Sequence, residues 1–331
     1  MARLDLSIAV GDYDRNRPLV DGSVQMDGVD PVFMLLSPEE IFFRAFRHAA
    51  FDICELSLSS YTVKTANRDC SYIAVPVFPS RAFRHTSIVI RTDRGIEKPE
   101  DLKGRRIGTP EYQLTACVWA RALLDDEFGV KPTDVTWVRG GMDQPGRIEK
   151  INLDLPGVKF DDAPPDGTLN EMLENGEIDG LIGPRLPACM RENDPSVPVG
   201  WLFDDPTAAA TDYYKRTGVF PIMHVLGIRR ELAEKHQWLP GAVYKAFELA
   251  KAAAIARLSD TSATKVTLPF VEEQLRAARA LLGDDFWSYG FDANRKTLDT
   301  FLQHHHAQGL SSRRVEPEEL FHPSTLEGFK I

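Results

Sequence analysis

The chain has 331 residues and a mass of 37.1 kDa, with 43% hydrophobic and 27% charged residues. These values are typical of globular proteins and exclude a largely disordered or fibrous chain. The 49 acidic residues outnumber the 39 basic ones, and a net charge of −10 has the wrong sign for a protein that follows a phosphate backbone. We therefore expect no nucleic-acid partner, and the length predicts two domains or one large α/β body.

The amino terminus does not have the pattern of an export signal. Arg3 and Asp5 interrupt what would have to be its apolar region, and no long apolar stretch follows. The sequence contains no run of about 18 apolar residues, so no membrane span is predicted. Its four cysteines are far apart and form no C-x-x-C pair. We expect a cytoplasmic protein with free thiols.

The first half of the chain alternates short apolar strands with amphipathic helices, which favours an α/β fold. One helix is predicted to begin after Ser37, because Pro38 and Glu40 follow it in the pattern of a capping box. Further helices are predicted from Pro110 and over 169–175, and residues 57–61 resemble a polar turn. Strands are predicted at 4–10, 51–56, 73–77, 86–91, 106–108, 135–138 and 178–182. A loop interrupted by Gly and Pro is predicted from the end of the 135–138 strand to about Gly167.

The second half of the chain is mainly helical. After a strand at 225–228, the sequence predicts long helices over 240–257, 265–282 and 293–308. His304, His305 and His306 lie in the last of these, where successive side chains point about 100° apart and cannot converge on one metal ion.

Several common catalytic motifs are absent from the sequence. There is no phosphate-binding G-x-x-x-x-G-K-[ST] loop, no dinucleotide-binding G-x-G-x-x-G, no G-x-S-x-G nucleophile elbow and no H-E-x-x-H zinc motif. No cofactor is predicted, and metal dependence is left open.

Two windows of this acidic chain contain no acid at all. Residues 70–92 and 213–230 have neither Asp nor Glu, although the average composition predicts about three acids in the first window. Such windows favour an anion-binding site, and ordinary strand-edge and surface arginines are the open alternative. The basic residues in the two windows that bear on the site are Arg81, Arg84, His85, Arg216 and His224.

Polar segments follow three of the predicted strands, at residues 11–15, 57–61 and 110–115. In open α/β sheets, ligands bind beyond the carboxyl ends of the strands, where helix amino termini offer free N–H groups. Ser59, Ser60 and Thr115 could bind a ligand there or serve only in turns and caps. The rings of Tyr13, Tyr61 and Tyr112 could stack on an aromatic ligand or lie at the edge of the core.

Long segments of the chain resemble the 4,5-dihydroxyphthalate decarboxylase family. They are GDYDR (11–15), EIFFRAFRH (40–48), ELSLSSY (55–61), VPVFPSRAFRH (75–85), EDLKGRRIGTPEYQLTA (100–116), VTWVRGG (135–141), RTGVFPIMH (216–224), YGFDANRKTLDTFL (289–302) and EELFHPSTLEGFKI (318–331). The resemblance implies a two-lobed α/β fold like that of type II periplasmic binding proteins, with the site in the interlobe cleft. Lobe I would comprise 1–85 and 222–331, and lobe II would comprise 86–221 including the return crossing, so that the chain crosses twice.

The activity that this resemblance implies is non-oxidative decarboxylation of 4,5-dihydroxyphthalate to 3,4-dihydroxybenzoate and CO2 in phthalate catabolism. Three roles follow for the residues already named. His85 or His224 would donate a proton to the ring, and Asp12 or Glu111 would polarise the phenol. Planar arginine forks would hold the carboxylates. The arginines are Arg81, Arg84, Arg185 and Arg216, and the other expected substrate-binding residues are Tyr13, Ser59, Ser60, Tyr112, Gln113 and Thr115.

A non-catalytic solute-binding or ligand-sensing protein for a small aromatic or carboxylate anion is the alternative, because the same fold and the same arginines serve simple binding. Two histidines at the expected site favour an enzyme. The expected partner is a small aromatic dicarboxylate. Another phthalate or a hydroxybenzoate is an open alternative as substrate, and homo-oligomerisation is left open.

Overall fold

The computed structural model describes residues 3–147 and 155–327, which form two compact units. The first unit comprises 1–81, 222–299 and 315–331, and the second comprises 82–221 and 300–314. The chain therefore passes from one unit to the other four times, whereas the sequence led us to expect two passages. The additional passages arise because residues 300–314 cluster with the second unit, where the ring of Phe301 lies 5.3 Å from that of Trp119.

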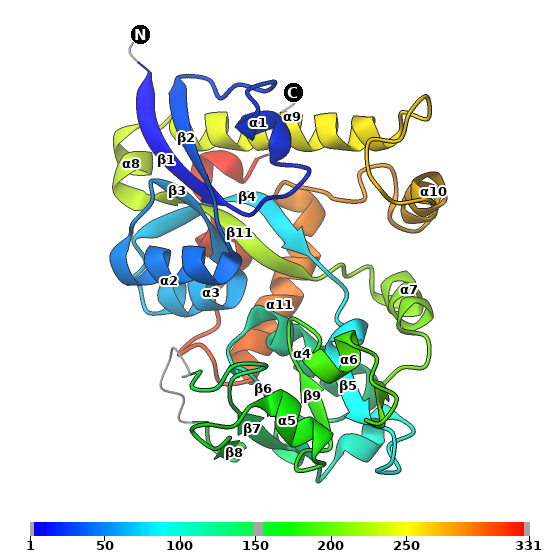
Figure 1. Cartoon of the computed structure of the whole chain (residues 1–331). Coiled ribbons are helices and arrows are strands. Elements are labelled where there is room, and N and C mark those ends of the chain that lie inside the picture. The colour runs from blue at the N-terminus through cyan, green and yellow to red at the C-terminus, as the bar shows by residue number, and fades with distance from the viewer. Residues whose placement is uncertain (1–2, 148–154, 328–331) are drawn as a thin grey trace. The chain divides into compact units, whose positions relative to one another are not determined.

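The first unit contains a five-stranded sheet with the order β2-β1-β3-β11-β4 (Figure 1). Four strands run parallel, and β11, which comes back from the second half of the chain, runs antiparallel between β3 and β4. Most residues of these strands are apolar and buried, as expected for a sheet covered on both faces. The strands are β1 (Leu4–Val10), β2 (Val29–Leu35), β3 (Ile53–Ser57), β4 (Tyr72–Arg81) and β11 (Ile222–Arg229).

Helices cover both faces of this sheet (Figure 1). Helices α2 and α3 lie together on one face, and the long α9 lies along the other with α1 packed against it. The predicted start of α2 is confirmed, because Ser37 Oγ accepts a hydrogen bond of 3.4 Å from the backbone N–H of Glu40. The helices are α1 (Arg17–Val20), α2 (Pro38–His48), α3 (Leu58–Ala66), α8 (Arg230–Lys235), α9 (Leu239–Leu258), α10 (Val271–Leu282) and α11 (Arg295–Ala307), which continues into the second unit.

The second unit contains a six-stranded sheet with the order β10-β5-β9-β6-β7-β8. Strands β6 to β9 are parallel, and β5 is antiparallel to both of its neighbours. The strands are β5 (Ile88–Arg91), β6 (Arg106–Thr109), β7 (Thr136–Arg139), β8 (Lys159–Asp162), β9 (Gly180–Ile182) and β10 (Val199–Trp201). The helices are α4 (Thr115–Phe128), α5 (Leu169–Glu174), α6 (Ala188–Arg191) and α7 (Pro206–Thr217).

Short 3-10 helices complete the two units. They are η1 (His85–Ser87), η2 (Pro99–Leu102), η3 (Pro132–Asp134), η4 (Asp292–Asn294), η5 (Pro317–Leu320) and η6 (Pro323–Thr325). The last two return to the first unit, where Tyr61 Oη donates a 2.5 Å hydrogen bond to the carbonyl of Leu320 and accepts one from the N–H of Ala74. These bonds place the Tyr61 ring in the core, which excludes it as a stacking platform.

Some elements differ from their predictions, each for a local reason. Residues 58–61 form the first turn of α3 and not a polar turn, because the serines there start a helix. Strand β2 was not predicted, because Asp30 and Pro31 interrupt the apolar pattern expected of a strand. It lies at the edge of the sheet, where a strand tolerates proline. The edge strand β8 is equally polar and lay in the predicted loop, α7 was missed, and α10 begins at Val271 instead of residue 265.

The three consecutive histidines of α11 contact two residues, Asp126 and Ser311. His304 Nε2 lies 2.7 Å from a carboxylate oxygen of Asp126, while His305 Nδ1 faces the hydroxyl of Ser311 and His306 Nδ1 faces its carbonyl. Within ranges 3–147 and 155–327, none of the helices is both long and apolar enough to cross a membrane.

Candidate functional site

In the first unit, a buried carboxylate gathers polar groups at the carboxyl ends of β1 and β3. Glu55 is fully buried in β3, and its Oε2 accepts a 3.0 Å hydrogen bond from the N–H of Gly11. Its Oε1 accepts a 3.0 Å bond from Tyr13 Oη and lies 2.5 Å from His224 Nδ1. The structure thus brings together two residues that the sequence singled out, Tyr13 and His224, around an acid that it did not.

The position after β1 is a glycine because the Tyr13 ring folds back over it. A Cβ atom at Gly11 would lie 2.3 Å from Cζ of Tyr13, which no side chain can do without displacing the ring. With glycine there, the phenol hydroxyl reaches Glu55.

Strand register explains how Glu55 and His224 meet. His224 pairs with Ser57 across the β3–β11 ladder, and Leu226 pairs with Glu55, so Glu55 and His224 are diagonal neighbours on one face of the sheet. The pairing of β11 with β4 is irregular on both sides of His224. Such irregularities re-aim side chains and are frequent next to active sites. Phe42 of α2 then fixes the imidazole from one side, with ring centroids 4.9 Å apart in an edge-on arrangement.

The charges of this cluster follow from its surroundings. Burial raises the pKa of Glu55, but the interactions with His224, Gly11 and Tyr13 outweigh it and hold that pKa below its ordinary value, so Glu55 is a carboxylate. Burial, with the adjacent Glu55 charge, raises the pKa of Tyr13 well above its ordinary value, so Tyr13 stays a neutral phenol. A carboxylate only accepts hydrogen bonds, so the proton between His224 and Glu55 is on His224 Nδ1.

The other first-unit residues expected in the site have different positions. Arg81 is buried, and its guanidinium donates to the carbonyl of Ser288 at 2.7 Å and to the side chain of Asn294, which ties it into the fold. The exposed side chain of Asp12 pairs with Arg17. Ser59 is fully buried in the first turn of α3, and Ser60 beside it is partly exposed.

A cation that the sequence did not single out lies beside Tyr13. The guanidinium of Arg15 lies 4.3 Å from the centre of the Tyr13 ring and 4.5 Å from that of Trp287, and its Nε donates to the carbonyl of Pro79 at 2.7 Å. Two aromatic faces and a carbonyl thus hold one positive charge next to the phenol that contacts Glu55. The GDYDR segment contained the signal, but nothing in it distinguishes Arg15 from a surface arginine.

In the second unit, polar residues gather after β6. Glu111 is 1% exposed, and its Oε1 lies 2.7 Å from Nε and 2.6 Å from Nη2 of Arg147. Gln113 Nε2 donates a 3.2 Å hydrogen bond to the other carboxylate oxygen. Thr115 is buried at the first position of α4. The structure therefore groups Glu111 with Gln113 and adds Arg147, which had no distinguishing sequence signal in its irregular segment.

Tyr112 lies in the core beneath this group. Its ring is fully buried, with the guanidinium of Arg121 3.6 Å from its centre and the rings of Trp137 and Phe160 packed edge-on against it. These contacts favour the core-edge interpretation of Tyr112 over stacking on a ligand.

Arg84 is a partly buried arginine of this unit. Its Nη1 lies 3.4 Å from Ser87 Oγ, and withdrawal of the guanidinium from water lowers its pKa to about 10. An anionic ligand would favour the charged form and offset that cost. Arg185, by contrast, is exposed in the segment after β9.

His85 and Arg216 line a different cavity of the second unit, of about 490 Å³. Arg216 pairs with Asp212 at 2.8 Å and with Glu127, so its charge is already matched. Four acids and only two cations line this cavity, which opposes binding of a dianion. The acids are Glu97, Glu127, Asp204 and Asp212, and the cations are Lys98 and Arg216.

The His85 ring is nearly buried in the wall of that cavity. It contacts the rings of Phe203 and Tyr213 at centroid distances of 5.1 and 5.6 Å. Burial lowers the pKa of His85 to about 4, so its imidazole is neutral near pH 7. Neither ring nitrogen has a hydrogen-bond partner in the described part of the chain.

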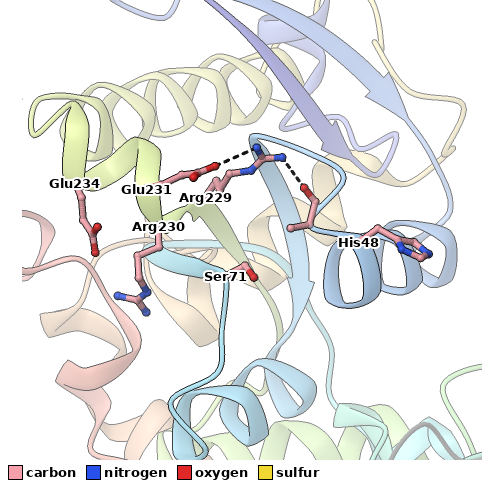
Figure 2. A pocket seen from close by; sticks show the side chains of 7 residues that line it. His48, Ser71, Arg229, Arg230, Glu231 and Glu234 are labelled. Atoms are coloured by element: carbon pink, nitrogen blue, oxygen red, sulfur yellow. Dashed lines mark hydrogen bonds and ion pairs between the residues drawn. The ribbon is translucent and has the colours of Figure 1, made fainter.

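Figure 2 shows a further cavity of about 450 Å³ in the first unit. It lies at the end of β11 opposite to His224, and it is lined by two arginines and two glutamates whose charges balance. Arg229 there donates to Glu231 at 3.2 Å and to the carbonyl of Ala49 (Figure 2). The balanced charges do not suit a dianion. The lining residues are His48, Ala49, Ser71, Arg229, Arg230, Glu231 and Glu234.

Among residues 3–147 and 155–327, no three or more His, Cys, Asp or Glu side chains are grouped as the ligands of a metal ion would be. The groups described around Glu55 therefore offer hydrogen bonds, charge and a histidine paired with a buried carboxylate.

Comparison with solved structures defines the class of fold. The aliphatic sulphonate binding protein SsuA from Escherichia coli covers all of this chain with 96% of its own, at a TM-score of 0.53 and 16% identity. A putative periplasmic sulfonate-binding SsuA from Methylobacillus flagellatus gives a TM-score of 0.55 at 13% identity, covering 98% and 94% of the two chains. Residues 28–145 also match a family described as "ABC transporter, phosphonate, periplasmic substrate-binding protein". The predicted two-lobed α/β fold of the periplasmic binding protein type is thus confirmed.

Comparison with curated sequences defines the family. A 4,5-dihydroxyphthalate decarboxylase from Comamonas testosteroni is 64% identical over 332 aligned positions, which cover 100% of both chains. One from Pseudomonas putida is 63% identical over 216 positions, covering 65% of this chain and 83% of the other. This chain belongs to the 4,5-dihydroxyphthalate decarboxylase family, as the resemblance of its segments implied.

Proposed function

We propose that the protein is an aromatic acid decarboxylase that converts 4,5-dihydroxyphthalate to 3,4-dihydroxybenzoate and CO2. The observation that carries the proposal is the 64% identity to a curated decarboxylase along the whole chain, far above the identity to the solute-binding proteins that share only the fold. The histidine–carboxylate pair supports it further, because binding a carboxylate anion does not require such a pair.

The chemistry requires a proton donor. Each carboxylate of 4,5-dihydroxyphthalate is para to a ring hydroxyl, so electron density from that oxygen can be directed to the carbon that carries the carboxylate. A proton added to this carbon forms the new C–H bond. The C–C bond to the carboxylate then breaks, its electron pair restores the aromatic ring, and CO2 leaves. One proton is consumed overall.

His224 is the better of the two candidate donors. Its Nδ1 is held by Glu55, which stabilises an imidazolium, and its side chain is 16% exposed, so the ring remains accessible. Its Nε2 has no hydrogen-bond partner in the described residues. His85 does not suit the role, because a pKa of about 4 leaves it neutral at pH 7 and acidic residues prevail around its cavity.

Arg84 is the proposed partner of a substrate carboxylate in the second unit. It is partly buried, and burial lowers its pKa. A carboxylate bound beside it would stabilise the charged guanidinium. A charge-assisted hydrogen bond of this kind contributes about 1.5–3 kcal/mol.

Asp12 and Glu111 stay the candidates for polarising the phenol, and Asp12 shares its segment with Gly11 and Tyr13. A substrate site in the cleft between the lobes also stays a prediction.

One assay tests the proposed function. The purified protein is incubated with 4,5-dihydroxyphthalate while CO2 and 3,4-dihydroxybenzoate are measured over many turnovers. We expect one CO2 for each 3,4-dihydroxybenzoate. Stabilisation of the protein by the compound without any product would instead identify a solute binder or sensor. Phthalate without hydroxyls is the matched control, because it has no para oxygen to supply electron density and should give no product.

A further inference from the structure

We infer that Glu55 is a positioning residue for the decarboxylation, which keeps the ring proton of His224 on Nδ1 and thereby leaves Nε2 as the nitrogen that loads and delivers the catalytic proton. The inference rests on the proposed function, since it takes His224 as the donor. It assigns a role to the acid of a fully buried strand.

The geometry around Glu55 fixes its charge and orientation. Three donors converge on its two oxygens: the N–H of Gly11 on Oε2, and Tyr13 Oη and His224 Nδ1 on Oε1. A buried carboxylate with three donors has its lone pairs directed and has little freedom to rotate. A buried acid in a strand is costly unless it is paired in this way, so Glu55 has a role beyond packing.

The contact with Glu55 selects one form of the neutral imidazole. Because a carboxylate has no proton to donate, the proton must be on Nδ1 of the ring, and Nε2 then has a free lone pair. Nε2 can take a proton from water to form an imidazolium that Glu55 stabilises. In the chemical step the Nε2–H bond breaks as the new C–H bond forms on the substrate, and the ring returns to its Nδ1–H form.

The other groups around His224 leave Nε2 free for this task. Phe42 of α2 covers one side of the ring without a polar atom, and Ser80 is the residue of β4 opposite His224 in the ladder. The titratable groups that share the cluster are Glu55 of β3 and Tyr13 after β1. The charges of Glu39 of α2 and of Arg15, which lies over the Tyr13 ring, also act on Tyr13. Among residues 3–147 and 155–327, only Glu55 contacts the imidazole through a hydrogen bond.

Glu55→Gln tests the inference by two independent readouts. The first is the tautomer of His224, read by long-range ¹H–¹⁵N NMR of the imidazole rings at alkaline pH and assigned by loss of the signal in His224→Asn. We expect Nδ1–H in the wild type and Nε2–H in Glu55→Gln, because the glutamine amide can donate to Nδ1. The second is kinetic: kcat falls about 10²-fold or more while KM changes less than threefold.

Tyr13→Phe is the matched control, because it removes one hydrogen bond from the same oxygen of Glu55 and leaves the contact with His224 in place. We expect it to keep the Nδ1–H tautomer. Glu55→Asp keeps the carboxylate and should keep that tautomer as well, with a kcat between those of the wild type and Glu55→Gln. It also replaces Glu55→Gln if the latter does not fold.

An Nε2–H tautomer in the wild type, or an unchanged kcat in folded Glu55→Gln, would overturn the inference. The NMR measurement needs no turnover. If the wild type shows the Nδ1–H form yet decarboxylates nothing, the proposed function fails and the role of Glu55 in positioning the ring stands.

Discussion

His224 and Glu55 are 169 positions apart in the chain, yet Nδ1 of one lies 2.5 Å from Oε1 of the other. The contact exists because β11 inserts next to β3 and places both side chains on one face of the sheet. A histidine–carboxylate pair built in this way depends on the pairing of two strands and not on a local motif.

Replacing the two candidate histidines should separate their roles. His224→Asn removes the proposed donor, so we expect kcat for 4,5-dihydroxyphthalate to fall about 10²-fold or more. His85→Asn should leave kcat within about twofold, because a histidine with a pKa of about 4 is not a proton donor at pH 7. Initial rates of CO2 release at pH 7 measure both. Equal losses in the two variants would contradict the assignment of His224.

Arg84→Met should weaken substrate binding. The loss of a charge-assisted bond worth about 1.5–3 kcal/mol predicts a KM that is about tenfold to a hundredfold higher. Titration of the substrate in steady-state assays measures the change. Arg94→Met is the matched control, since Arg94 is an exposed arginine of the same unit whose Nη2 donates to the carbonyl of Gly176. A higher KM in both variants to the same degree would argue against a specific contact with Arg84.

Lys251 is a structural cation, and its loss should lower stability without affecting chemistry. The side chain is nearly buried in α9, its Nζ lies 3.0 Å from Glu248 and 2.9 Å from Asp285, and it lies 4.6 Å from the centre of the Tyr289 ring. Lys251→Met leaves the carboxylate of Glu248 largely buried without its partner. We expect the free energy of unfolding in urea to fall by about 2 kcal/mol.

A control for this effect lies on the same helix. Lys245 is exposed and pairs with the exposed Asp27 at 3.0 Å, so Lys245→Met should change the free energy of unfolding by less than about 0.5 kcal/mol. If the two substitutions lower the free energy of unfolding by the same amount, the burial of Lys251 adds nothing to the stability of the protein.

The pH dependence of stability should report on His85. Its pKa in the folded protein, about 4, is below the ordinary value of 6.5, so the unfolded chain binds the proton more tightly. The free energy of unfolding should therefore decline as the pH falls from about 6.5 to about 4 because of this residue. In His85→Gln that part of the decline is absent. Urea midpoints at several pH values measure the difference between the two proteins.

His48→Gln provides the comparison for this titration, because His48 is an exposed histidine at the end of α2. We expect its urea midpoints to follow those of the wild type at every pH. A wild-type curve parallel to that of His85→Gln would show that protonation of His85 does not oppose folding.

Local signals were sufficient for much of the fold. The start of α2 was predictable from Ser37 and Glu40, since a capping box lies within four residues. Strand β2 was not, because Asp30 and Pro31 contradict strand propensity, and only its place at the edge of the sheet makes them acceptable. The order of the strands depends on pairings between distant segments that no window of sequence contains.

The candidate site divides in the same way. Tyr13 and His224 attracted attention from their place after a strand and in an acid-free window, and both contact Glu55. Glu55 lies in the predicted strand 51–56, but its contact with His224 depends on which strand pairs with β3. His85 and Arg216 have suitable chemistry in sequence and lie in a cavity whose acids oppose a dianion, because the neighbours from α4 and α7 could not be inferred.

The place of β11 in its sheet has a consequence for synthesis on the ribosome. Residues 222–229 lie between β3 and β4, so the first 81 residues emerge with a gap in the middle of their sheet. The second unit emerges next, and it stays incomplete until residues 300–314 have been synthesised. Neither half of the molecule can be finished before the other is well advanced, so the nascent polypeptide completes its folding only when translation is nearly over.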